Sequence, residues 1–213
     1  LQGMKDLIVA HDITSYECQA DHLMRPETFM HACQEVAEMH ASENGLGYDW
    51  GMSNHTIWVE VQGEFRFVRR PKWKDTILLR TNTGKASALQ ARRFVEMTDK
   101  EGNLLAQADL YWVLIDIDSR RPVPLKRVNL VMNDACPQLI PEPVPAMPEC
   151  PVASTAEFIA PRRDVDFNGH INNGAYLIWT LDTLPEDIQP GAAPARVSIR
   201  FKHESRAGEP MKV

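Results

Sequence analysis

Apolar and polar positions alternate with two different periods in the first 135 residues of the chain. From Arg25 to Gly45 the apolar residues recur at helical spacing, with a proline and a glutamate in the first turn and an Asn-Gly stop at the end. Strand-like segments rich in β-branched and aromatic residues then follow at 56–67, 76–83, 89–97 and 104–117, separated by turn signals. One long helix followed by an antiparallel meander predicts an α+β unit whose helix packs on one face of the sheet.

A proline-rich stretch, residues 136–151, separates this region from the rest of the chain. Proline is excluded from helix and sheet interiors, so we expect a semi-rigid linker between an N-terminal unit (4–135) and a C-terminal unit (152–213). The second unit repeats the order strand (157–161), helix (172–184), strand (195–203). When Phe67 is aligned with Phe201 the two regions resemble each other, which indicates a divergent internal duplication.

The duplication predicts that the second unit is incomplete. About 50 residues of strand-like text follow Phe67 in the first unit, whereas 213 − 201 = 12 residues follow Phe201. The second unit therefore lacks roughly three strands, and the open sheet edge is an aggregation liability. We expect the native protein to be longer than this chain.

Composition and charge narrow the functional classes. With 44% hydrophobic and 24% charged residues, the chain has the balance of a globular protein. Its net charge of −6 disfavours nucleic acid as a partner, and no apolar stretch is long enough for a membrane span. The four cysteines form no zinc-type spacing, so neither a metal nor another cofactor is expected. The absence of a signal-peptide pattern and the unpaired cysteines favour a cytoplasmic location.

The richest chemistry lies in the stretch RRDVDFNGHINNGAY, residues 162–176. Asp164, Asp166, Asn168 and His170 occupy every second position, so an extended segment would point all four side chains to one side. The segment leads into the predicted helix, where unpaired N–H groups can stabilise negative charge on a carbonyl oxygen. Glu204 is a second polar point, in an otherwise alternating strand. The residues alone leave two readings open: a structural Asp/Asn turn with a solvated histidine, or a catalytic cluster.

The string DVDFNGHINNGAYLIWTLD resembles the active-site motif of acyl-acyl carrier protein (acyl-ACP) thioesterases of the plant and bacterial type, D-x-D-x-N-x-H-x-N-N-x-x-Y. Residues 57–81, with a tryptophan-containing strand and a Pro-x-Trp-x-Asp turn, and residues 99–125, with D-x-x-G and R-R-P, resemble the same family. The likeness covers nearly the whole chain with its motifs in the expected order. It implies a tandem hotdog fold, in which each unit is a long helix on an antiparallel sheet.

The resemblance also implies site residues. Asp166, Asn168 and His170 match the family's catalytic Asp, Asn and His, and Glu204 matches its catalytic acidic residue, 204 − 170 = 34 positions after the histidine. Ser205 stands where plant members often carry a cysteine, so a Cys–His mechanism is not expected and Ser205 as nucleophile is a minor alternative. Glu204 as general base and His170 as general base oriented by Glu204 are equally compatible with the sequence.

The resemblance places the acyl chain in the first hotdog unit, and the expected product is a free fatty acid released from acyl carrier protein during fatty acid biosynthesis. An apolar tunnel is required. Its candidate lining residues are the methionine and aromatic side chains Phe29, Met30, Met39, Trp50, Met52 and Trp58. Because the carrier is acidic, docking requires a local basic patch, for which Arg69-Arg70, Lys72, Lys74, Arg92-Arg93, Arg120-Arg121 and Arg162-Arg163 are the candidates.

Two rival functions remain from the sequence. One is a hotdog dehydratase or hydratase acting on acyl thioesters, and the other is a non-catalytic acyl-thioester binding module. Chain-length preference, acyl carrier protein versus coenzyme A, and a homodimer versus a monomer are not decided by the residues.

Overall fold

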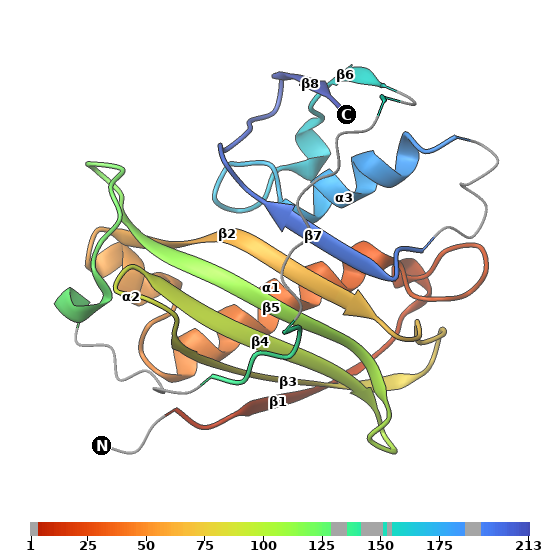
Figure 1. Cartoon of the computed structure of the whole chain (residues 1–213), viewed down its shortest axis with the longest axis horizontal. Helices are drawn as coiled ribbons and strands as arrows, with labels where there is room; N and C mark the ends of the chain where they lie inside the picture. Colours follow the sequence, from red (N-terminus) through yellow and green to blue (C-terminus); the bar gives the residue numbers. More distant parts are fainter. Residues whose placement is uncertain (1–3, 129–135, 142–150, 153–154, 186–192) are drawn as a thin grey trace.

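The computed structural model describes residues 4–128, 136–141, 151–152, 155–185 and 193–213 (Figure 1). The first unit contains β1 (Leu7–Asp12), the short 3-10 helix η1 (Ser15–Glu17), α1 (Pro26–Glu43), α2 (Tyr48–Ser53), β2 (Thr56–Phe67), β3 (Thr76–Lys85), β4 (Gln90–Asp99), β5 (Leu104–Asp116) and η2 (Leu125–Val128). The second unit contains β6 (Glu157–Ile159), η3 (Arg162–Asp164), α3 (Asn173–Asp182), β7 (Arg196–Arg200) and β8 (Pro210–Lys212). The predicted helices and strands are therefore present, whereas β1, α2 and β8 were not predicted.

One antiparallel sheet joins the two units. Its strand order is β1-β3-β4-β5-β2-β7, so the strand of the second unit pairs with β2 of the first at the edge of the sheet (Figure 1). In that pairing Phe65 lies opposite Val197 and Gly63 opposite Ile199. Because β7 extends the first unit's sheet, residues that follow it in sequence are brought next to the first unit.

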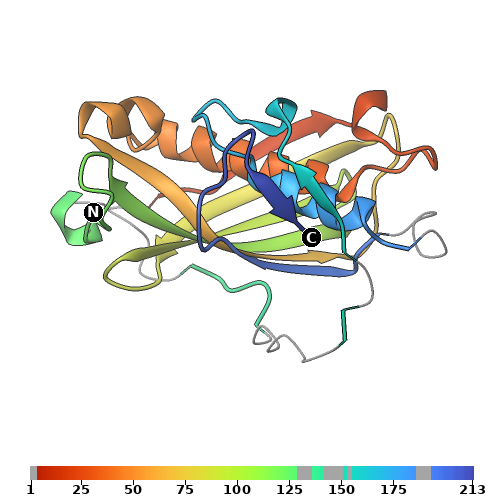
Figure 2. The ribbon, with the colours of Figure 1, turned by 90° about the horizontal axis from the view of Figure 1, so that it is seen from above.

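Helices α1 and α3 lie on the same face of this sheet and pack against each other (Figure 2). Helix α1 begins at Pro26, which suits a first helical turn because its missing N–H would have had no partner there. Its apolar stripe faces the sheet as predicted, and Phe29 contacts Phe65 and Phe67 edge to face. The main core lies between α1 and the sheet, with Phe29, Cys33, Phe65, Val95 and Leu110 almost fully buried.

Residues 136–141 of the predicted linker cross the opposite face of the sheet (Figure 2). The backbone N–H groups of Leu139 and Ile140 donate to the Asp109 carboxylate at 3.2 and 2.7 Å, and Ile140 is buried. The Arg92 guanidinium donates to the Cys136 carbonyl oxygen. This part of the linker is held against the sheet, and residues 142–150 lie outside the described residues.

The second unit repeats the strand pairing of the first. Strand β6 pairs antiparallel with β8, just as β1 pairs with β3. In sequence, α3 and β7 lie between β6 and β8, as α1 and β2 lie between β1 and β3. A small apolar cluster of Ala160, Ile171, Ala175 and Trp179 forms its core. The topology supports the internal duplication, and in the described part of the second unit β4 and β5 have no counterpart.

Candidate active site

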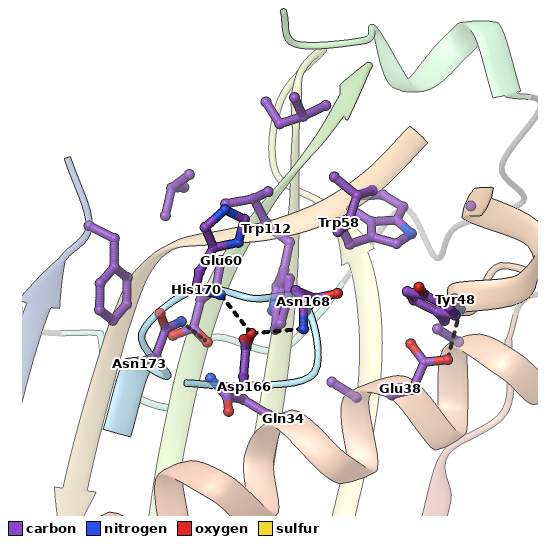
Figure 3. Close-up of a pocket in the computed structure, with 18 of the residues that line it drawn as sticks. Gln34, Glu38, Tyr48, Trp58, Glu60, Trp112, Asp166, Asn168, His170 and Asn173 are labelled. Atoms are coloured by element: carbon purple, nitrogen blue, oxygen red, sulfur yellow. Dashed lines mark hydrogen bonds between the residues drawn. The ribbon is translucent and has the colours of Figure 1, made fainter. Parts of the chain in front are cut away.

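The motif after η3 forms a tight turn. Val165 and Ile171 form an antiparallel bridge, and between them the Asp166 carboxylate accepts the Asn168 N–H at 2.9 Å and the His170 N–H at 3.3 Å (Figure 3). Gly169 has a φ of +83°, a conformation that favours glycine. The expectation of an extended segment is therefore wrong, because the Asp166 side chain satisfies the backbone donors of a turn.

Consequently the four alternating side chains do not share one side. Asp166, Asn168 and His170 line a cavity, whereas Asp164 accepts the indole N–H of Trp179 at 2.8 Å and supports the apolar cluster of the second unit. Ser205 accepts the Ile171 N–H with its backbone oxygen and is not among the residues that line the cavity. Asp164 and Ser205 thus lie outside the group of residues that face the cavity.

Helix α3 begins directly after this turn. Asn172 caps it by accepting the Gly174 N–H at 2.8 Å, and its side-chain amide donates to Gln34 of α1 at 3.1 Å. Within the described part of the chain, the N–H of Asn173 has no acceptor. Asn173 lines the cavity, so a backbone donor and the positive end of the helix dipole meet there.

Glu204 lies beside His170 and links the two units. Its Oε2 atom is 3.2 Å from Nε2 of His170, and its other oxygen accepts a charge-assisted hydrogen bond from Arg120. Arg120 belongs to the turn after β5 of the first unit and has a φ of 57°. The sequence analysis named Arg120 only as a candidate for carrier docking. Its pairing with Glu204 could not be predicted, because that pairing depends on the contact between the two units.

Nε2 of His170 faces Glu204 within ion-pair distance, and because an ionised carboxylate has only acceptor atoms, this contact favours the tautomer with its proton on Nε2. Nδ1 of a neutral His170 then carries the lone pair and can accept a proton. A carboxylate, an imidazole, an amide side chain and an unpaired helix N–H are thus gathered at one end of the cavity.

The cavity has a volume of about 750 Å³ and is lined by both units. Of the six expected tunnel residues, Met52 and Trp58 line it, and Trp112 and Ala91 extend its apolar wall. Phe29 and Met30 are 0% and 2% exposed in the main core, and neither they nor Met39 nor Trp50 are among the lining residues. The cavity lies beside the hydrophobic core, and the periodicity of apolar residues cannot distinguish side chains that line the cavity from side chains that fill the core.

Glu60 on β2 is a buried acid in the same wall that the sequence analysis did not identify. Its Oε2 atom accepts a hydrogen bond from the Asn173 side chain at 3.3 Å (Figure 3). Burial raises the pKa of Glu60 to about 7, although the side chains of Asn173 and Gln34 act to lower it. The sequence could not identify Glu60 as a buried acid, because the burial of this side chain in β2 depends on its contact with Asn173 of α3.

The basic candidates for carrier docking divide into two groups. Arg70 is paired with Asp21 at 2.5 Å and Arg93 is 6% exposed, so these two lie inside the molecule, whereas Arg120 is exposed but paired with Glu204. The side chain of Arg163 is 84% exposed, and Arg162 is also at the surface.

Among the described residues no group of His, Cys, Asp or Glu could hold a metal ion, and no helix could span a membrane.

Comparison with protein families matches both units of this chain. The acyl-ACP thioesterase N-terminal domain matches residues 8–128, and the acyl-ACP thioesterase C-terminal domain matches residues 151–213. The chain belongs to the acyl-ACP thioesterase family. The resemblance drawn from the motif is thereby confirmed.

Curated members of the acyl-ACP thioesterase family are distant in sequence. The chain is 28% identical over 210 residues to the chloroplastic palmitoyl-acyl carrier protein thioesterase of Cuphea hookeriana, covering 90% of this chain and 50% of that protein. It is 28% identical over 201 residues to the chloroplastic oleoyl-acyl carrier protein thioesterase 2 of Arabidopsis thaliana, covering 83% and 53%. The chain thus spans about half the length of these relatives.

Solved structures of acyl-ACP thioesterases share the fold. The acyl-ACP thioesterase of Bacteroides thetaiotaomicron has a TM-score of 0.81 at 20% identity, covering 96% of this chain and 84% of that one. The 12:0-ACP thioesterase of Umbellularia californica has a TM-score of 0.82 at 22% identity, covering 97% and 80%. The predicted α+β hotdog architecture is confirmed.

Proposed function

We propose that this protein is a thioester hydrolase that releases free fatty acid from an acyl chain carried on acyl carrier protein, in fatty acid biosynthesis. The observation that carries the proposal is the contact of Glu204 with His170 at the mouth of an apolar cavity, beside the start of α3. The names of the matched relatives support acyl carrier protein as the carrier.

The geometry favours His170 as the general base. Both oxygens of Glu204 are engaged, one by Arg120 and one by His170, so the carboxylate is held in place and orients the imidazole. A water molecule would attack the thioester carbonyl carbon while its proton passes to His170. The tetrahedral intermediate would then collapse with cleavage of the C–S bond, and the departing thiolate would take the proton from His170.

Two donors are available for the oxyanion of that intermediate. The N–H of Asn173 is unpaired at the start of α3, and the Asn168 side chain lines the same end of the cavity. Donors fixed before the reaction stabilise developing charge without reorganisation. Asp166 does not contact the reacting atoms in this scheme; it positions Asn168 and His170 by holding their turn.

The direct test is thiol release from a panel of acyl carrier protein thioesters of different chain length, followed with a thiol reagent. We expect release with the wild-type chain and its loss in Glu204→Gln, which retains the shape of the side chain. Glu157→Gln is a matched control, because Glu157 forms an exposed pair with Lys212 away from the cavity.

The outcomes separate the proposal from its rivals. Formation of an enoyl product without thiol release would establish a dehydratase or hydratase. Tight acyl binding without any conversion would establish a binding module. Equal turnover of Glu204→Gln and the wild type would refute the site assignment.

A further inference from the structure

The cavity contains a buried cation that the hydrolytic reaction does not use. Arg93 on β4 is 6% exposed and lines the cavity, and among the described residues Glu38 is the carboxylate that acts on its charge, outside ion-pair distance. Its Nη1 atom donates to Thr81 Oγ1 at 3.1 Å and to His40 Nδ1 at 3.2 Å. Glu38 also lines the cavity, but its Oε1 atom accepts hydrogen bonds from Ser42 and from the Tyr48 N–H.

The histidine beside Arg93 does not share its positive charge. Arginine has only donor atoms, so Nδ1 of His40 must be the acceptor, and the proton lies on Nε2, which is 2.9 Å from the Lys5 carbonyl oxygen. Burial and the neighbouring guanidinium both lower the pKa of His40 and hold it neutral. Burial lowers the pKa of Arg93 to about 10, so the guanidinium is still charged at neutral pH.

Helix α1 separates this cation from the reaction site. His31 lies against Gly174 at the start of α3, where a side-chain carbon at Gly174 would be 2.3 Å from His31 Nε2. His40 follows nine residues later, which corresponds to about 13.5 Å along the helix. Ala37 of α1 and Trp58, Ala91 and Trp112 of the sheet line the same cavity and make this part of its wall apolar. On the sheet, Ala91 lies two residues before Arg93 and pairs with Trp112, which pairs with Glu60 beside Asn173, so two strand spacings, about 10 Å, separate β4 from the start of α3. Arg93 therefore lies at about the reach of a medium-length acyl chain.

A plain hydrocarbon terminus would leave this charge with two neutral acceptors, on Thr81 and His40, and with Glu38 only at longer range. Buried charges are normally paired, and a cavity wall that holds a guanidinium outside ion-pair distance of any described carboxylate is complementary to an oxygen acceptor. We propose that Arg93 binds a carboxylate at the far end of the acyl chain, so that the preferred substrates are ω-carboxyacyl thioesters. This inference deepens the proposed function and rests on it, because it names the acyl group that the same site would hydrolyse.

The test compares acyl thioesters of equal length that end in a methyl, a hydroxyl or a carboxylate group, across several lengths. A site built around a hydrogen-bonding group rejects an analogue that lacks it, so at the fitting length we expect kcat/KM to be about 100-fold higher for the carboxylate-ended chain than for the methyl-ended chain. In Arg93→Met the ratio should invert, and Arg93→Lys should retain part of it. Arg92→Met is the matched control, since Arg92 donates to Cys136 on the opposite face of the sheet.

A binding experiment makes the inference independent of turnover. Thermal shifts of the wild type and Arg93→Met are measured with α,ω-dicarboxylic acids and with monocarboxylic fatty acids of equal length. A stabilisation by the diacid that Arg93→Met abolishes would support the subsite even if no thioester were hydrolysed, in which case only the proposed function would fail. Preference for methyl-ended chains at every length, equal ratios in wild type and Arg93→Met, or no binding of either acid would overturn the subsite.

Discussion

The turns that precede α1 and α3 have the same backbone and different side chains. With an offset of 147 residues, the Cys18–Met24 bridge corresponds to the Val165–Ile171 bridge (18 + 147 = 165; 24 + 147 = 171). In the first turn the Gln19 N–H donates to the Leu23 oxygen at 2.9 Å, and in the second the Asp166 N–H donates to the His170 oxygen at 2.8 Å. Even the positive φ recurs, at 63° for His22 and 83° for Gly169 (22 + 147 = 169).

The segments that follow β2 and β7 and face these turns carry opposite charges. Arg70 and Glu204 are equivalent with an offset of 134 (70 + 134 = 204). Arg70 binds Asp21, Gln19 and the Met24 oxygen, and therefore ties its turn to the strand. Glu204 instead faces His170, in the place that Leu23 occupies in the first unit (23 + 147 = 170). One backbone arrangement thus serves stability in the first unit and, we propose, chemistry in the second.

The largest effect should come from the residues that distinguish the second turn. His170→Ala and Glu204→Ala should each reduce kcat by about 10³-fold with little change in melting temperature, because general acid–base catalysis typically contributes 10²–10⁴-fold. Added imidazole should restore part of the thiol release in His170→Ala. Rescue of Glu204→Ala by formate, with no imidazole rescue of His170→Ala, would show that Glu204 is the base.

The second prediction concerns the pH dependence of the free energy of unfolding that results from the buried Glu60 of the first unit. Its folded-state pKa of about 7 lies above the usual value for glutamate, so its contribution to stability is present in acid and is lost as the pH rises through about 7. The full difference is up to about 3 kcal/mol. Glu60→Gln should therefore match the wild type near pH 4.5 and be the more stable protein at pH 8.

Denaturant unfolding across that pH range measures this difference. Glu101→Gln, in an exposed turn of the first unit, is the control and should keep the wild-type dependence. Parallel curves for the wild type and Glu60→Gln would contradict a buried neutral acid at this position.

Arg70→Met should reduce stability without altering catalysis, the reverse of the effect at Glu204. Removing the largely buried guanidinium leaves Asp21 without its ion pair and should lower the free energy of unfolding by about 2 kcal/mol. Arg69→Met, which breaks an exposed pair with Asp99, should have a much smaller effect. Urea denaturation and thiol release are measured on the same samples. A loss of turnover in folded Arg70→Met would contradict the assignment of stability to the first turn and of catalysis to the second.

Arg120 should have the smallest effect, because it acts through Glu204. Loss of its charge-assisted hydrogen bond in Arg120→Gln should lower kcat/KM about tenfold, mainly through kcat, and Arg120→Lys should restore part of it. Arg121→Gln is the control, since the exposed Arg121 meets Asp116 only through its backbone. A change confined to KM would indicate that Arg120 binds the carrier protein instead.

The residues by themselves determined the duplication, the motif and most of the elements, but not β1, α2 or β8. The long helix at 26–43, the four strands that follow it and the alternation of apolar residues in β7 depend on local periodicity, which survives without tertiary context. The string at 164–182, together with the motifs at 57–81 and 99–125, likewise identified the family, because these motifs follow one another along the chain in the family's order.

Tertiary structure alone decided which side chains share a space. The pairing of Arg120 with Glu204 and the burial of Glu60 beside Asn173 both arise where the second unit meets the first, whereas the turn at Asp166 is held by hydrogen bonds only two and four residues apart. The same holds for the cavity, which is lined by Met52 and Trp58 but not by the equally apolar Phe29 and Met30. Periodicity reports which face of an element is covered, whereas a binding cavity and a catalytic pair depend on contacts between residues far apart in the chain.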